Sequence, residues 1–123
     1  MNSQQNNNQI IQEDYSDFKK GISIQREIYK NANLNNDYDT MVKCIENIKI
    51  EVKQKAIKKR NEKDIEYIEK AIQWYRMLPS KYKKRTQEGI IYNYPENLHI
   101  QINQNLNRAY EKIINILTIL DLI

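Results

Sequence analysis

One metal-like spacing occurs in the 123-residue chain, Glu96-Asn97-Leu98-His99. A Glu-x-x-His pair on a helix is half of the ligand set that di-iron helical bundles use. The other half requires a second histidine, and His99 is the only histidine in the chain. We therefore expect no metal site and no cofactor. We assign Glu96 to the start of a helix and His99 to an ordinary helix surface.

Paired carboxylates are a second source of chemistry. Glu62, Glu66 and Glu69 share one side of a predicted helix, and carboxylates can act as acid and base where burial separates their pKa values. Lys63 and Lys70 lie at helical spacing from these residues. Such neighbours favour solvated ion pairs over an acid–base pair.

Cys44 and the two glycines are the remaining residues that could have a catalytic or binding role. Cys44 is the single cysteine, which excludes an intramolecular disulfide and a cysteine-based zinc site. It lies beside an apolar helical stripe, which predicts a buried side chain and not a nucleophile. Gly21 and Gly89 alone cannot build a glycine-rich phosphate loop. We therefore expect no enzymatic activity and no small-molecule substrate.

Basic residues are concentrated in residues 52–85. This segment has 12 lysines and arginines against four acidic residues, a formal charge of +8, whereas the rest has eight basic and 12 acidic residues. A basic stripe of this kind is typical of proteins that bind the phosphate backbone of DNA or RNA. The candidate nucleic-acid-binding residues are Lys53, Lys55, Lys58, Lys59, Arg60, Lys63, Arg76, Lys81, Lys83, Lys84 and Arg85.

Aromatic residues near the end of this stripe extend the hypothesis. Trp74, Tyr82, Tyr92 and Tyr94 could stack on exposed bases. The alternative is a solvated basic face with aromatic residues packed inside the protein. Ile, Asn, Lys and Tyr make up 61 of 123 residues. AT-rich codons encode all four, so codon usage alone supplies many lysines.

The C-terminal segment suggests a different function. Its last turns are apolar on most of their circumference, which is typical of a helix buried on several sides. Either the rest of the chain covers it, or a second copy or a larger assembly does. The second hypothesis is therefore an adaptor or a small structural subunit, such as one from a virus or mobile element. Its interface residues would be Ile113, Ile116, Leu117, Leu120 and Ile123.

Helices must position these residues, because apolar side chains recur at intervals of three and four. The spacing predicts helices over residues 10–31, 37–59, 62–78 and 95–122. One long kinked helix over 37–78 is the alternative to the middle pair.

Caps and turns set the expected boundaries of these helices. Asn36 and Asn61 are natural N-caps, and Asn93 with Glu96 resembles a capping box. The 79–94 connection is long for a bundle. We expect a short helix within it, with Ser80 as its cap and Gly89 at its end.

The whole chain fits one domain. Two glycines and two prolines disfavour a many-turned β fold. Residues 1–9 are a polar Asn/Gln tract, so we expect a disordered arm followed by one helical domain over 10–123. We see no signal peptide and no apolar run of about 18 residues, so we expect no membrane span and a cytoplasmic location. The predicted fold is an all-α, up-down bundle of about four helices.

Overall fold

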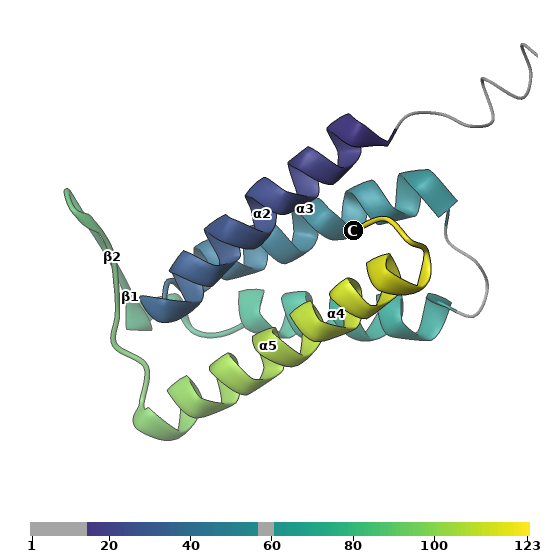
Figure 1. Ribbon diagram of the computed structural model, residues 1–123. Coiled ribbons are helices and arrows are strands. Elements are labelled where there is room, and N and C mark those ends of the chain that lie inside the picture. Colours follow the sequence, from purple (N-terminus) through teal and green to yellow (C-terminus); the bar gives the residue numbers. More distant parts are fainter. Residues whose placement is uncertain (1–14, 57–60) are drawn as a thin grey trace, which may run out of the picture.

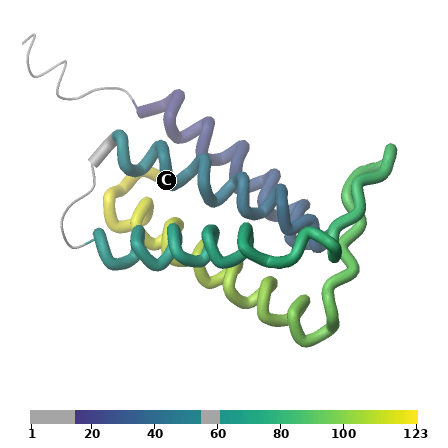
Figure 2. The backbone as a smooth tube through the Cα atoms, turned by 180° about the vertical axis from the view of Figure 1, so that it is seen from behind, coloured from purple at the N-terminus to yellow at the C-terminus, as the bar shows by residue number. Residues whose placement is uncertain are grey.

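The computed structural model describes residues 15–56 and 61–123. Within these ranges the chain forms an up-down bundle of four helices, in which α3 packs against the other three (Figures 1 and 2). The helices are α2 (Ser16–Leu34), α3 (Tyr38–Ala56), α4 (Glu62–Arg76) and α5 (Glu96–Ile119). The predicted all-α bundle is confirmed, and the alternative of one helix over 37–78 is wrong.

Some predictions fall outside the described residues. These are the arm over residues 1–9, the start of the first predicted helix at 10–14, and Lys58, Lys59 and Arg60. The first helix continues to Leu34, three residues beyond the predicted end.

The core follows the predicted apolar spacing. A helix has 3.6 residues per turn, so apolar residues three and four apart form one stripe that the bundle buries. Cys44 is buried, as predicted. The buried stripes are Met41, Ile45, Ile48 and Val52 in α3, Ile65, Ile68, Ile72 and Tyr75 in α4, and Ile102, Leu106, Ala109, Ile113 and Ile116 in α5. No helix in the described part of the chain has the length and apolarity needed to span a bilayer.

The start of α3 differs in detail from the prediction. Asp37, and not Asn36, caps this helix: the backbone N–H of Thr40 donates to Asp37 Oδ1 at 3.4 Å, and the Thr40 hydroxyl donates to Oδ2 at 2.6 Å. Asn36 instead has a φ of 54°. Asparagine tolerates this left-handed conformation better than most residues, so Asn36 turns the chain between α2 and α3.

The predicted caps of the other two helices do not form hydrogen bonds. Asn61 occupies the N-cap position of α4, but its side chain makes no capping hydrogen bond. Pro95 is the N-cap of α5, again without a side-chain cap. The capping box predicted from Asn93 and Glu96 is therefore wrong.

A β-hairpin occupies the connection between α4 and α5, where the sequence predicts a short helix. Only a three-residue 3-10 helix, Ser80–Tyr82, forms there, and Pro79, not Ser80, occupies its N-cap position. It leads into β1 (Lys83–Thr86), which pairs antiparallel with β2 (Gly89–Tyr92). Gly89 does not end a helix. It has a φ of +130°, which a residue without a Cβ adopts readily. The hairpin projects from one end of the bundle, beyond the end of α4 and the start of α5 (Figure 1).

The turn of the hairpin is held by Thr86. Its hydroxyl donates to the Gly89 carbonyl oxygen at 2.8 Å and accepts the Glu88 backbone N–H at 3.2 Å. Thr86 is directly opposite Gly89 in the strand register. The tip is therefore a two-residue loop, and the two strands continue in register to its base.

Candidate nucleic-acid interface

The projecting hairpin carries a group of unpaired cations. Lys81, Lys84 and Arg85 are exposed, and no carboxylate among the described residues pairs with them. Lys81 Nζ lies 5.2 Å from the centroid of the Tyr82 ring, a cation–π distance that leaves the positive charge intact. Three cations within five residues thus face solvent, Lys81 at the base of the hairpin and Lys84 and Arg85 along β1.

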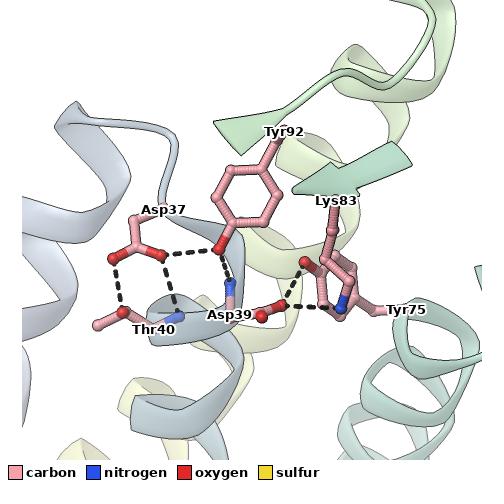
Figure 3. Close-up of polar contacts among 6 residues, drawn as sticks. All are labelled: Asp37, Asp39, Thr40, Tyr75, Lys83 and Tyr92. Atoms are coloured by element: carbon pink, nitrogen blue, oxygen red, sulfur yellow. Dashed lines mark hydrogen bonds and ion pairs between the residues drawn. The ribbon is translucent and has the colours of Figure 1, made fainter. Parts of the chain in front are cut away.

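Lys83 has a different role from its neighbours. Its Nζ lies 3.3 Å from Asp39 Oδ1 and 5.4 Å from the centroid of the Tyr75 ring (Figure 3). Asp39 lies in the first turn of α3 and Tyr75 in the last turns of α4. Lys83 therefore joins β1 to two helices, and its charge is largely neutralised there.

Tyr92 anchors the other strand to the same place. Its hydroxyl donates to Asp37 Oδ1 at 2.9 Å and accepts the backbone N–H of Asp39 at 3.0 Å (Figure 3). The Tyr75 hydroxyl donates to Asp39 Oδ1 at 2.7 Å. The start of α3 thus holds both strands, one through Lys83 and the other through Tyr92.

The two tyrosine hydroxyls in this network remain protonated. Burial raises the pKa of Tyr75 and of Tyr92 well above the ordinary value, and the carboxylates of Asp39 and Asp37 raise it further. A hydroxyl that stays protonated keeps donating its hydrogen bond. Both hydroxyls therefore keep donating to the carboxylates at neutral pH.

A cluster of aromatic rings packs behind the hairpin. Tyr94 is only 5% exposed, and its ring centroid lies 5.5 Å from that of Tyr82, 6.2 Å from that of Tyr92 and 5.7 Å from that of His99. His99 is half-buried, and its Nδ1 is hydrogen-bonded to the Tyr38 hydroxyl at 2.8 Å. The prediction that His99 is an ordinary surface residue is therefore wrong.

These contacts change the expectation for base stacking. Tyr94 is part of the core, and the Tyr92 ring is held at its hydroxyl by α3. Trp74 and Tyr82 are half-buried and pack against the core. The buried Tyr94 offers no ring face to a base, which corrects the prediction for that residue.

The helical part of the predicted stripe is largely neutralised by ion pairs. Lys70 lies 2.9 Å from Glu66, which confirms the ion pair predicted for this glutamate. Glu69 instead pairs with two lysines of α3, Lys49 at 3.6 Å and Lys53 at 3.7 Å. Lys63 is exposed at the start of α4, at the end of the bundle opposite the hairpin (Figure 2). The side chain of Lys55 lies outside the described residues.

Arg76 makes the best-formed ion pair of the stripe. Its Nη1 and Nη2 donate to the two carboxylate oxygens of Glu46 at 2.7 and 2.8 Å. Paired groups of this kind have less charge to offer a phosphate. The structure therefore divides the predicted stripe into cations paired on α3 and α4, Lys63 at the opposite end of the bundle, and a separate, unpaired group at the hairpin.

The Glu46–Arg76 pair predicts a pH-dependent contribution to stability. The hydrogen bond from Arg76 lowers the pKa of Glu46 below its usual value. The pair therefore stabilises the fold above the pKa of unfolded glutamate, about 4.3, and its contribution is lost as the pH falls through the folded-state pKa. We expect Glu46→Gln to reduce the free energy of unfolding by about 0.2–1 kcal/mol at pH 7, the range for exposed pairs. Urea unfolding at pH 7 and at about pH 3.5 should show this difference shrinking. An equal difference at both values would contradict the assignment.

The candidate interface residues of the C-terminal helix mostly face inward. Ile113, Ile116 and Leu117 are buried in the core of the chain itself, so in this structure they present no surface to a partner. Leu120 is partly buried against the same core, and Ile123 is 38% exposed. The covering of this helix is thus supplied largely by the chain itself.

Neither metal ligation nor similarity to known proteins adds a further function. Within residues 15–56 and 61–123, no group of three or more histidine, cysteine, aspartate or glutamate side chains could hold a metal ion. Comparisons with protein-family models, with curated proteins and with solved structures found no match. The geometry of the hairpin is therefore the main observation that bears on function.

Proposed function

We propose that this protein is a non-enzymatic nucleic-acid-binding protein that contacts the phosphate backbone through its basic hairpin. The observation that carries the proposal is the position of three unpaired cations, Lys84 and Arg85 on β1 of the projecting hairpin and Lys81 in the 3-10 helix at its base (Figure 1). Cations that release counterions from phosphates supply most of the affinity of non-specific nucleic-acid binding.

The shape of the hairpin suits a duplex. The major groove of B-DNA is about 12 Å wide and admits a two-stranded β-ribbon. The base of this hairpin is held against the helices by Lys83 and Tyr92, and the part towards its tip projects beyond them in both views (Figures 1 and 2). The ribbon can therefore approach a groove before the bundle meets the backbone.

The anchoring network supports the same function. An isolated two-stranded hairpin is marginally stable in water, and ordering a loop during binding reduces affinity. Here Tyr92 and Lys83 tie both strands to the start of α3 before any ligand is present. The cations therefore belong to a hairpin whose bundle end is already held in place before binding.

The engagement of the aromatic rings favours a duplex over a single strand. Proteins that bind single strands stack bases on exposed aromatic side chains, whereas Tyr94 is buried and Tyr92 is bound to Asp37. We therefore propose backbone contact with a B-form DNA duplex. A-form RNA is a poorer ligand, because its major groove is deep and narrow.

A salt titration tests this function. Binding of a labelled 20-base-pair DNA duplex is measured by fluorescence anisotropy at several salt concentrations. Three phosphate contacts predict a slope of about −2.7 for the logarithm of the association constant against the logarithm of salt, since each contact contributes about −0.9. The affinity should fall roughly 40-fold between about 50 and 200 mM salt.

Single-stranded DNA and an RNA duplex of the same length serve as comparison ligands. We expect both to bind more weakly than the DNA duplex at the same salt concentration. The absence of DNA binding at low salt would contradict the proposed function, and tighter binding to the single strand would contradict the mode of contact.

A further inference from the structure

The two outer edges of the hairpin differ in their capacity to pair with another strand. The Asn93 backbone N–H donates to the Tyr82 carbonyl oxygen at 2.7 Å, and the register places these two residues opposite each other. Hydrogen-bonded and non-hydrogen-bonded pairs alternate along an antiparallel ladder. Lys84 with Ile91 is therefore a hydrogen-bonded pair, and Ile90 and Tyr92 direct their backbone groups away from β1.

The outer edge of β2 is unoccupied in the described part of the chain. No hydrogen bond from residues 15–56 or 61–123 reaches the backbone N–H or C=O groups of Ile90 and Tyr92 on this edge. The strand sequence, Gly-Ile-Ile-Tyr, is uncharged, and Ile91 is 49% exposed. An uncharged, exposed edge with β-branched residues is a template for another strand.

We propose that the β2 edge pairs with the β2 edge of a second copy of this chain, in an antiparallel arrangement about a two-fold axis. If this axis is perpendicular to the sheet, side chains on one face of the hairpin in the first copy lie on the same face of the joint sheet as their equivalents in the second copy. Ile90 then forms hydrogen-bonded pairs with Tyr92 of the second copy. Ile91 lies on the axis, opposite itself, in a non-hydrogen-bonded pair. The result is a four-stranded sheet with β1 on each outer side.

The charge pattern explains why β2 pairs in this way and β1 does not. The same symmetric pairing at the β1 edge would put Lys83 opposite Arg85 and Lys84 opposite itself, and like charges directly opposite each other destabilise a sheet. Charged edge strands are a common protection against pairing. In the β2 arrangement the two basic strands are three strand spacings apart, about 14 Å. A sheet of this width exceeds the roughly 12 Å major groove, so pairing at the β2 edge and entry of a single hairpin into the groove are alternative states of the chain.

Disulfide trapping tests the arrangement with the full chain and without nucleic acid, so its result is independent of the proposed function. Ile91→Cys places two thiols opposite each other in a non-hydrogen-bonded pair, where the Cα separation of about 4.5 Å falls within the range of a disulfide. The native thiol of Cys44 is buried and does not compete. Under mild oxidation we expect a covalent dimer on non-reducing gels, formed at least about tenfold faster than in a control variant.

Lys84→Cys is the matched control. Lys84 is exposed and lies beside Ile91 on the same face of the hairpin, but it lies on the outer strand of the proposed sheet. Equal rates for the two variants would overturn the proposal.

A measurement on the unmodified chain completes the test. Small interfaces are weak, so sedimentation is followed up to about 0.5 mM protein, where a shift towards the mass of two chains is expected. Ile91→Lys places like charges on the axis and should remove the shift. A mass of one chain at every concentration would overturn the proposal, as would a dimer that Ile91→Lys leaves intact.

Discussion

Replacement of Lys81, Lys84 and Arg85 by glutamate is expected to lower the affinity for a DNA duplex by roughly 10³-fold at about 50 mM salt. The association constant varies with the salt concentration to the power of about −0.9 for each phosphate contact. Without the three contacts it falls by the salt concentration raised to the power of about 2.7, which is roughly 10³-fold at about 50 mM salt. The three side chains are exposed and unpaired among the described residues, so their replacement leaves the core unchanged. The affinity is measured by anisotropy, and the fold by circular dichroism.

The matched control reverses three other exposed cations, Lys19, Lys20 and Arg108, which lie on α2 and α5. Both triple variants change the formal net charge from +4 to −2, because each replacement by glutamate removes one positive charge and adds one negative charge. If position matters, the control should lose no more than about threefold in affinity, the long-range effect of net charge. Equal losses in the two variants would show that net charge, and not the hairpin, determines binding.

The helical bundle could be predicted from the sequence because its signal is periodic and local. Ile102, Leu106, Ala109, Ile113 and Ile116 follow intervals of three and four, and all five are buried. A stripe of this kind stabilises one helix face against any apolar neighbour, so its burial can be inferred without knowing the neighbour. The same reasoning correctly places Cys44 in the core.

The hairpin could not be predicted in this way. Its strands have four residues each, too few for an alternating pattern to stand out. Gly89 suits both a helix end and a turn with positive φ, since glycine favours both. The hairpin is favoured by tertiary contacts, which a local sequence pattern does not show. The bonds of Tyr92 and Lys83 to the start of α3 join residues that are more than 40 positions apart.

The candidate site could be predicted only in part for a related reason. The number of charged residues can be read from the sequence, but the sequence does not show which of them form ion pairs. Arg76 and Lys53 belong to the same basic segment as Lys84 and Arg85, yet the first two are bound to Glu46 and Glu69 on neighbouring helices. Helix packing therefore decides which cations remain available to a ligand.

Leu117→Ala is expected to reduce the free energy of unfolding by about 2–5 kcal/mol, because it removes buried methyl groups and leaves a cavity. Leu117 is fully buried, at 0% exposure. The loss would be a large fraction of the about 5–15 kcal/mol that a domain of ordinary stability possesses. Urea unfolding followed by circular dichroism measures it, with the slope of the transition unchanged if the folded state keeps its compactness.

Ile119→Ala on the same helix separates the two roles considered for this segment. Ile119 is 59% exposed, and alanine has a higher helix propensity than isoleucine, so its replacement should change stability by less than about 0.5 kcal/mol. If Leu117 instead lay in an interface between separate chains, its replacement would weaken association and depend on protein concentration. A stability loss that is large and independent of concentration for Leu117→Ala, beside a negligible one for Ile119→Ala, therefore assigns Leu117 to the core. The reverse order would mean that α5 is rotated and that its apolar side faces a partner.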